Sequence, residues 1–449
     1  MKEWDKRLTP KRFRQTSMPS DPGWNPFDSD FSRITMSAPF RRLQDKAQVF
    51  PLEPNDFVRT RLTHSIEVSS VARSLGVRAE QWLMSKKLLS REKTGHIPSI
   101  LATASLAHDI GNPPFGHFGE KCIQIFFETN KKFLKGLNAE EKADLINFDG
   151  NVQGLRLLLR LGLSSDEFSY NLTFPTLATI AKYPKDSITG NQGDKKTISF
   201  KKYGFYQTDK EKYKEINDEL GLRNERHPLC FLLEAADDIC YIVSDTEDGF
   251  KKNTITLNIL LENINKPEYK KDTKCRELHK LIKALDKKYK NYENKESLIA
   301  QDCRIFAQWK MIPSAIKTFK TNHKSILNGD FHHELLDNSC SRQLKRFFKD
   351  ISANNFKHES VLTGELLGET IITYLLEKFC TAVFSTNCEN IKTVHGKLYK
   401  LLSHQSRYAM EKTSYSNNKY LKLLMIIDFV ASMTDSYALS LYRELSGLK

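Results

Sequence analysis

Residues 105–120, SLAHDIGNPPFGHFGE, carry side chains that could bind a metal ion and move a proton. His108 and Asp109 are adjacent at the end of an apolar run, and His117 and Glu120 follow after two prolines. An imidazole beside a carboxylate suits Mn²⁺, Fe²⁺, Zn²⁺ or Mg²⁺. Adjacent helical residues point about 100° apart, but the last turn of a helix is free to open, so both side chains can reach one ion. This segment therefore predicts half of a metal site.

Two further ligands would complete such a site. We predict His64, in RTRLTHSIE, and Asp237, in LLEAADDICYIVSD. Asp237 is preferred to Asp238 because Tyr241 and Asp245 follow it at i+4 and i+8 and share its helical face. Asp238 points elsewhere, where it caps the chain, pairs with a lysine or arginine, or supports a ligand. A single histidine in an apolar helix is more often a core residue, but burying two histidines and two carboxylates without partners would be costly.

The elements that must position these residues are helices. Helical periodicity dominates from Arg61 onward and strand signals are few, so the predicted class is mainly α. Prolines interrupt residues 1–60, which predicts an irregular lead with short helical pieces. The predicted helices that carry or flank the candidates cover residues 64–83, 97–111, 151–162 and 229–250, and others fill 250–300 and the C-terminal third.

We expect a single domain over residues 1–449, with a metal core at about 40–250 and a helical part at about 251–449 packed on it. Residues 185–225 are polar, lysine-rich and dotted with glycine, which indicates an irregular insertion with a short hairpin around ISFKKYGFY at 198–206. No internal repeat is present in the sequence.

The net charge of +14 and a pI near 9.2 favour polyanionic partners such as nucleotides, nucleic acid or an anionic surface. No run of 18 apolar residues is present, so we expect no membrane span. The opening MKEWDKRLTPKRFRQ has no apolar core, so we expect no signal peptide. The eight cysteines are scattered without a C-x-x-C pair, which argues against a thiolate zinc site or a disulfide scaffold. Together these features predict a cytoplasmic location.

The pattern of His64, His108–Asp109 and Asp237 resembles the H…HD…D signature of the HD-domain superfamily of metal-dependent phosphohydrolases. The predicted fold is therefore the HD-type helical fold. Further segments resemble bacterial deoxyguanosinetriphosphate triphosphohydrolases, in family order from about residue 28 to 440, whereas 185–225 and 250–360 match no motif of that family. These segments are DFSRITMSAPFRRLQDKAQVFPL, TRLTHSIEVSSVARSLG, AHDIGNPPFGHFGE, FDGNVQGLRLL, EAADDICYIVSDTEDG and DFVASMTDSYA.

This resemblance implies that dGTP is cleaved between the α-phosphorus and the 5′ oxygen, which yields deoxyguanosine and tripolyphosphate. Mn²⁺ is the expected metal ion, and Mg²⁺, Fe²⁺ or Co²⁺ remain open. His117 and Glu120 become a catalytic pair, in which the carboxylate orients the imidazole. Whether His117 protonates the 5′ oxygen or relays a proton from water stays open. The implied metal ligands are His64, His108, Asp109 and Asp237.

A triphosphate carries close to four negative charges, so several cations should line its site. Arg61 lies three residues before His64 on the same helical edge and is the firmest candidate. Lys182 follows FPTLATIA, which resembles a family stretch that contacts phosphate. Other candidates are equally consistent with ordinary surface or core residues: Arg41, Arg42, Lys46 and Tyr183.

The same resemblance also implies which residues contact the nucleoside part of the substrate. A Tyr241 ring against C2′ would exclude ribonucleotides, and Gln48 and Asp245 would hold the 3′-hydroxyl. The alternative is a core tyrosine and a helix-end charge. Asn112 and Asn151 stand where related HD triphosphohydrolases often carry histidine, and Asn112 is a further substrate-facing candidate. The preference for guanine rests on the resemblance alone.

Lysine runs at 193–214 and 266–295 alternate with the aromatic residues Tyr203, Phe205, Tyr206, Tyr213, Tyr289 and Tyr292. This composition is used by single-stranded DNA grooves, although such runs are more often solvated helix faces. The resemblance implies a homo-oligomer, hexameric by analogy, and admits single-stranded DNA as a partner. Three alternatives to a dGTP-specific enzyme remain. They are a dNTP triphosphohydrolase of broad base specificity, a different HD phosphohydrolase, and a nucleotide- or DNA-binding regulatory protein with little turnover.

Overall fold

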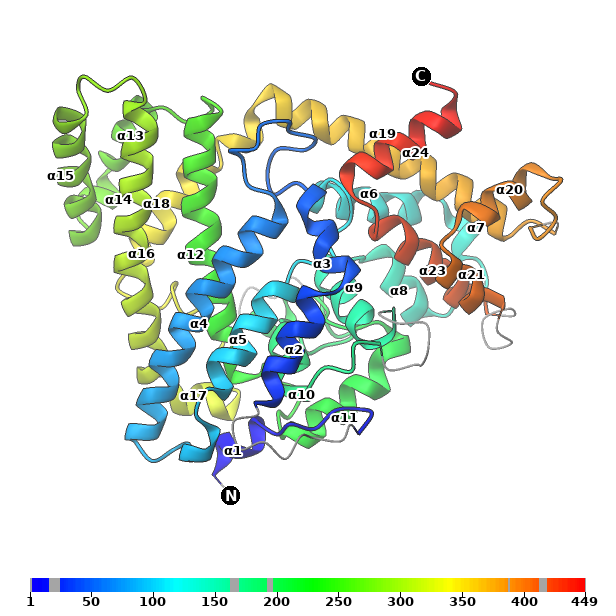
Figure 1. Ribbon diagram of the computed structural model, residues 1–449, viewed down its shortest axis with the longest axis horizontal. Helices are drawn as coiled ribbons and strands as arrows, with labels where there is room; N and C mark the ends of the chain where they lie inside the picture. Colours follow the sequence, from blue (N-terminus) through cyan, green and yellow to red (C-terminus); the bar gives the residue numbers. More distant parts are fainter. Residues whose placement is uncertain are drawn as a thin grey trace.

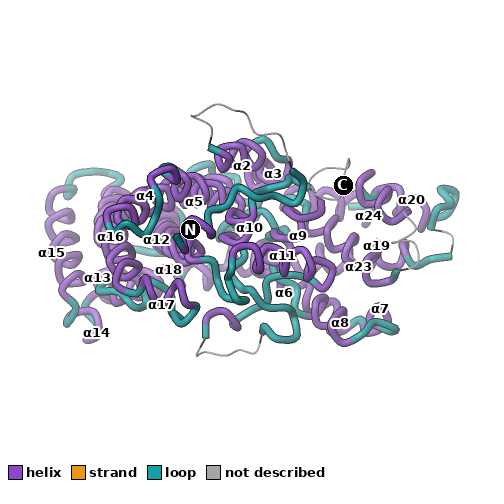
Figure 2. The backbone as a smooth tube through the Cα atoms, turned by 90° about the horizontal axis from the view of Figure 1, so that it is seen from below, coloured by secondary structure: helices purple, strands orange, loops and turns teal. Residues whose placement is uncertain are grey.

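The computed structural model describes residues 2–15, 25–161, 169–191, 197–386, 388–411 and 418–448. These residues form helices joined by turns, and they contain no β-strand beyond one isolated bridge between Ala47 and Thr60. The mainly α prediction is therefore confirmed. The molecule is elongated, with α15 (Thr273–Lys288) and α20 (Val394–Leu401) at opposite ends of its long axis (Figure 1, Figure 2).

The apolar core consists mainly of two clusters of buried side chains. The first is built by α1 (Glu3–Arg7), α2 (Pro26–Thr35), α3 (Ala38–Arg42), α4 (Arg61–Ser85), α5 (His96–Ala107), α10 (Phe174–Ile180), α11 (Lys210–Leu220), α12 (Pro228–Lys251), α13 (Leu257–Ile264), α14 (Pro267–Lys270), α15, α16 (Lys295–Thr321), α17 (His323–Asn328) and α18 (Arg342–Ser352). The second is built by α6 (Gly116–Thr129), α7 (Lys131–Leu134), α8 (Ala139–Ile146), α19 (Glu359–Val383), α20, α21 (His404–Glu411), α23 (Lys419–Ala431) and α24 (Asp435–Ser446). Helix α9 (Gly150–Arg156) contributes to both.

Short turns complete the secondary structure: η1 (Leu43–Asp45), η2 (Arg91–Lys93), η4 (Ile198–Phe200), η5 (Gln207–Asp209) and η6 (Asn355–Lys357). The π-helical turn η3 (Leu157–Leu161) extends α9, and Gly162, which was expected to stop this helix, lies outside the described residues. Each core cluster draws on both sides of residue 250. The single-domain organisation with its two parts stays a prediction.

Helices α4, α5 and α12 pack together and hold the candidate site (Figure 1). Helix α4 begins with a capping box in which Thr60 and Thr63 satisfy each other's backbone N–H groups. Its buried face follows helical spacing, and Gly76 lets α5 approach so closely that a Cβ there would lie 2.9 Å from Pro98 Cα. Helix α5 is buried almost all round, as its apolar sequence predicts.

A buried ion pair ties α9 to α23 beside the site. Arg156 on α9 donates to both carboxylate oxygens of Asp428 on α23, and Gln153 donates to the same carboxylate at 2.7 Å. Neither side chain of the ion pair is more than 5% exposed. Because an unpaired charge at this depth would be costly, the pair fixes how α23 sits against α9.

The segment at 198–206 is irregular, and the expected hairpin is wrong. It forms the single turn η4 and then an extended run whose tyrosines turn inward. Tyr203 donates a hydrogen bond to the backbone of Asp144, and Tyr206 donates to Gln153, so the run is held by side chains and needs no partner strand. Within the described residues no single helix is long and apolar enough to span a membrane, and only the bent pair α23–α24 meets the length and composition test together.

Candidate metal centre and active site

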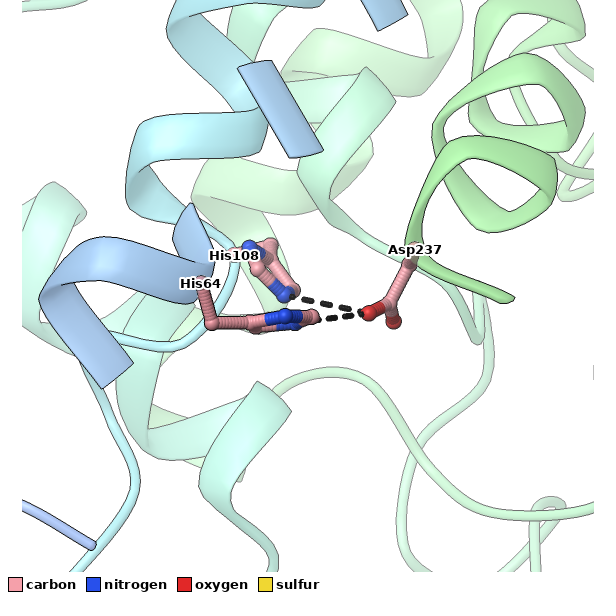
Figure 3. Close-up of side chains that lie close together, drawn as sticks. All are labelled: His64, His108 and Asp237. Carbon is pink, nitrogen blue, oxygen red and sulfur yellow. Dashed lines mark hydrogen bonds and ion pairs between the residues drawn. The ribbon is translucent and has the colours of Figure 1, made fainter. Parts of the chain in front are cut away.

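Three side chains from three helices converge at the centre of the molecule. His64 lies on α4, His108 caps the end of α5 and Asp237 lies on α12, and one ligand atom from each falls within 4.8 Å of the others. His64 Nε2 is 3.1 Å and His108 Nε2 is 3.5 Å from Asp237 Oδ1, and the three side chains point toward one another (Figure 3). Two imidazoles and a carboxylate are a suitable ligand set for a first-row divalent metal ion.

The surroundings of the two histidines fit a metal site. His108 Nδ1 donates to the carbonyl oxygen of Ser105 at 2.6 Å, which orients the ring and leaves Nε2 facing Asp237. His64 is 1% exposed, and its Nδ1 has no hydrogen-bond partner in the described part of the chain. The Nε2 atoms of both rings face Asp237 Oδ1, an arrangement that ligand chemistry explains better than core packing.

Asp109, the fourth predicted ligand, lies beside the three but not within the same group. Its Oδ1 is 3.7 Å from His108 Nε2 and accepts a hydrogen bond from Asn112 Nδ2 at 2.6 Å. Its Oδ2 pairs with Arg61 at 2.7 Å. Burial opposes ionisation of Asp109, but the Arg61 guanidinium outweighs it and holds the pKa of this carboxyl below its usual range. Gly116 makes room for Arg61, because a Cβ there would lie 2.7 Å from a guanidinium nitrogen.

The two adjacent aspartates of α12 face different partners. Asp237 pairs with Lys182 at 3.1 Å, so the lysine predicted to contact phosphate lies at the metal group. Asp238 pairs with Lys345 of α18 at 2.7 Å, as its predicted pairing with a lysine requires. Lys345 also contacts Glu334 at 2.5 Å, and burial raises the pKa of Asp238 to about 7. The choice of Asp237 over Asp238 therefore agrees with the geometry.

His117 and Glu120 form the predicted pair at the start of α6. His117 Nδ1 is 2.9 Å from Glu120 Oε2, and the hydrogen bond raises the pKa of the imidazole. The side chain of His117 is 78% exposed, whereas that of Glu120 is 7% exposed. Glu120 Oε1 accepts the backbone N–H of Gly150 at 2.8 Å, at the start of α9, where the helix dipole favours a carboxylate. A buried carboxyl group thus holds an accessible imidazole.

Glycine is required in the FDGNVQGLR segment because Glu120 and the turn after α5 approach its backbone closely. A Cβ at Gly150 would overlap Asn112 Oδ1 and lie 2.7 Å from Glu120 Oε1. A Cβ at Gly111 would overlap the backbone of Gly150 and Gly154. The turn after α5 and the start of α9 therefore cross in backbone contact, which only glycine permits.

These groups border a pocket of about 340 Å³. Several of its lining residues come from stretches in which the sequence showed no motif. Lys345 and Lys349 lie on α18, Phe356 on η6, and Val361 and Glu365 on α19. The full lining is Ala47, Gln48, Val49, Pro51, Arg61, His64, Asp109, Asn112, Phe115, Gly116, His117, Phe118, Asn151, Lys182, Lys201, Asp237, Asp238, Tyr241, Asp245, Glu334, Lys345, Lys349, Phe356, Val361 and Glu365.

The residues predicted for the nucleoside end share this pocket. Gln48, Tyr241 and Asp245 all line it, the last two one turn apart on α12. Gln48 Oε1 and Asp245 Oδ2 are buried and have no hydrogen-bond partner among the described residues. Burial raises the pKa of Asp245 well above its ordinary value. Two unsatisfied acceptors beside a tyrosine ring suit a ligand that donates hydrogen bonds.

The remaining cation candidates lie away from the pocket. Lys46 is 2% exposed, and its ammonium donates to the backbone carbonyls of Asn112 and Ala431, so it fastens the turn after α5 to α23. Burial lowers the pKa of Lys46 to about 7. Arg41 donates a hydrogen bond to the backbone carbonyl of Met36. The Tyr183 ring is buried, and the Arg226 guanidinium lies over it. Arg42 is exposed outside the pocket lining.

The aromatic residues of the first lysine run are core residues. Tyr203, Phe205, Tyr206 and Tyr213 are between 0% and 8% exposed, so their rings are not available for stacking on bases. In the second run Tyr289 donates a hydrogen bond to Asp302, whereas Tyr292 is 59% exposed. The lysines of these runs and their buried aromatic rings are therefore separate structural features, although they alternate in the sequence.

Comparison with known proteins agrees with this geometry. The HD domain family model matches residues 61–147, the span that contains α4, the His108–Asp109 pair and α6, and defines the class as an HD-domain protein. A deoxyguanosinetriphosphate triphosphohydrolase-like protein of Listeria innocua is 37% identical over 99% of this chain and 100% of its own length. A Synechocystis protein of the same description is 35% identical over 99% of each chain. The deoxyguanosinetriphosphate triphosphohydrolase of Klebsiella pneumoniae is 31% identical over 94% of each. The chain belongs to the deoxyguanosinetriphosphate triphosphohydrolase-like family of HD-domain proteins.

Proposed function

We propose that this protein is a metal-dependent triphosphohydrolase that converts dGTP and water to deoxyguanosine and tripolyphosphate. The observation that carries the proposal is the His64–His108–Asp237 group opening on a pocket that also holds lysines and unsatisfied acceptors. The names of the Listeria and Klebsiella relatives support the same reaction.

His64, His108 and Asp237 would hold the metal ion, with Asp109 as the fourth ligand. A divalent cation bound there supplies Lewis acidity to the α-phosphate and activates water. We favour Mn²⁺, and the ligand types leave Mg²⁺, Fe²⁺ and Co²⁺ as alternatives. Lys182, Lys201, Lys345 and Lys349 line the same pocket, and with Arg61 they offset the charge of a triphosphate.

His117 serves as the proton donor in this proposal. Its Nδ1 is engaged by Glu120, which leaves Nε2 as the ring nitrogen able to reach a substrate at the pocket mouth. When the bond between the α-phosphorus and the 5′ oxygen breaks, the water oxygen joins phosphorus and the 5′ oxygen needs a proton. The hydrogen bond and charge of Glu120 raise the pKa of His117, which favours the protonated imidazole that can supply that proton.

The nucleoside would lie between α12 and α19. Gln48 Oε1 and Asp245 would flank the 3′-hydroxyl, whose single O–H donates to one of them, and the Tyr241 ring would oppose a 2′-hydroxyl. Glu365 would face the base, with Phe356 beside it in the pocket wall. Guanine presents two adjacent donors, N1–H and the 2-amino group, and a carboxylate can accept from both. Adenine lacks this pair of donors, which gives the pocket a basis for preferring dGTP.

A product assay tests the reaction and the base preference together. The protein is incubated with Mn²⁺ and each of the four dNTPs and four NTPs, and the products are separated. Deoxyguanosine with intact tripolyphosphate, formed fastest from dGTP, is the expected result. Equal release from all four dNTPs would retain the mechanism and remove the role of Glu365. The assay is repeated with Mg²⁺, Fe²⁺ and Co²⁺ in place of Mn²⁺. No turnover with any of these four metal ions would favour a nucleotide-binding regulatory protein on the HD scaffold.

A cytoplasmic location, a homo-oligomer and single-stranded DNA as a further partner stay predictions. The buried aromatics of the first lysine run do not support a stacking groove there, so DNA would have to use other surfaces.

A further inference from the structure

The connection between α18 and α19, residues 353–358, is anchored to α12 by one buried side chain. Asn355 is 0% exposed, and its Nδ2 donates to the backbone carbonyl of Asp245 at 2.7 Å. Its Oδ1 accepts from the hydroxyl of Thr254, which lies just beyond the end of α12. The amide therefore joins two points of one helix to the connection.

Helix α12 is shaped to admit this side chain. A Cβ at Gly249 would overlap Asn355 Oδ1 and lie 2.5 Å from Ile255 Cδ1. Gly249 lies one turn after Asp245, so the glycine opens the helix surface beside the carbonyl that Asn355 reaches. A glycine inside a helix is less favourable than alanine, which a close contact of this kind can offset.

The anchored position lies between two walls of the pocket. On α12, Tyr241 and Asp245 line it, and the Asn355 bond ends on the backbone of Asp245 itself. The next residue after Asn355 is Phe356 of η6, which lines the same pocket together with Val361 and Glu365 of α19. A shift of the connection would change the separation of these walls. Lys182 and the candidate metal ligand Asp237 pair with each other, and the side-chain hydrogen bonds of Asn355 in the described residues go to Asp245 and Thr254 instead.

We propose that Asn355 is a positioning residue that sets the width of the nucleoside end of the pocket, and hence the selection of deoxyribose and base. The inference rests on the proposed function, since it assigns the α12 and α19 walls to the nucleoside. Asn355 acts through Asp245 and Phe356 and does not line the pocket.

The test uses products as probes, because neither is turned over. Deoxyguanosine and inorganic tripolyphosphate are titrated calorimetrically into the Mn²⁺-loaded wild type and into Asn355→Asp and Gly249→Ala. Asn355→Asp keeps the shape but turns an acceptor toward the Asp245 carbonyl. Asn354→Ala is the matched control, because Asn354 lies on the same connection and donates only to the local carbonyl of Ile351. Turnover of dGTP and GTP is measured in parallel.

Loss of a buried hydrogen bond with an unpaired acceptor left behind predicts that deoxyguanosine binding weakens about tenfold in Asn355→Asp, with tripolyphosphate binding changed less than about twofold. The preference for dGTP over GTP falls in the same variant, and Asn354→Ala behaves as wild type. Equal weakening of both probes, or unchanged deoxyguanosine binding, would overturn the proposal. A wild type that releases no tripolyphosphate refutes the proposed function instead, and the ratio of the two binding constants still decides the role of Asn355.

Discussion

The hydrogen bond between Glu120 and His117 can be tested by the substitution Glu120→Gln. The carboxylate accepts from two donors, the imidazole Nδ1 at 2.9 Å and the Gly150 N–H at 2.8 Å. Glutamine has the same shape but only one acceptor oxygen, so one of these donors must face an amide N–H instead. Because Glu120 is buried, that mismatch is not relieved by water, and the imidazole loses the charge that favours its protonated form.

The size and sign of the effect follow from the geometry. A hydrogen bond to a charged group contributes about 1.5–3 kcal/mol, and the exposure of His117 places this one at the lower end, so kcat should fall about tenfold to thirtyfold. Glu120 raises the pKa of His117, whereas Arg61 and Lys202 oppose it. A proton donor acts below its pKa and fails as the pH rises through it. Removing the Glu120 charge lowers that pKa, so the alkaline limb of the profile moves to lower pH.

The assay is kcat for dGTP at saturating Mn²⁺ between pH 5.5 and 9.5, values that bracket the ordinary pKa of histidine near 6.5. Glu141→Gln is the control, since this carboxylate also accepts a backbone N–H, from Asn138 in a capping box of α8 outside the pocket. Mn²⁺ binding should be unchanged in both variants. An alkaline limb that stays in place in Glu120→Gln, or a kcat equal to wild type, would refute the assignment of His117 as a donor tuned by Glu120.

Three further substitutions separate the parts of the site. Asp237→Ala should abolish Mn²⁺ binding and turnover together, as seen by calorimetry and product assay, and retained Mn²⁺ affinity would exclude this carboxylate as a ligand. Tyr241→Ala should raise kcat/KM for GTP about tenfold relative to dGTP, and an unchanged ratio would disprove steric exclusion of the 2′-hydroxyl. Glu365→Gln should lower kcat/KM for dGTP about tenfold and leave dATP within about twofold, whereas equal losses would place Glu365 away from the base.

The candidate metal ligands were predictable because each is marked by residues close to it in the sequence. His108 and Asp109 lie at a helix end marked by glycine and proline, and α4 and α12 each show a buried face that fixes the direction of His64 and Asp237. The spacing of Tyr241 and Asp245 from Asp237 is likewise a property of one helix, and all three line one pocket. Periodicity within a helix thus predicted that these three side chains share one face, but not that Asp238 lines the pocket as well.

The pocket wall from residues 334–365 was not predictable, because its contribution depends on how distant helices pack. Lys345 lies on a strongly amphipathic helix, where the sequence predicts that a lysine is exposed to solvent. In the structure it is 5% exposed and pairs with Asp238, more than 100 residues earlier in the chain. The burial of Tyr203 and Tyr206 was not predictable for the opposite reason. Their lysine-rich surroundings indicated a surface, but their hydroxyls bond Asp144 and Gln153 inside the second core cluster.

The backbone crossing at Gly111 and Gly150 links the two halves of the chemistry. Gly111 follows the His108–Asp109 pair by two residues, and its contact with Gly150 and Gly154 fixes where the end of α5 lies relative to α9. Gly150 also donates the N–H that holds Glu120, and Glu120 holds His117. The separation of the candidate metal ligands and His117 is therefore set by buried backbone contact, although His117 itself is exposed. This arrangement explains how an accessible imidazole can keep a defined position while the pocket mouth stays open to substrate.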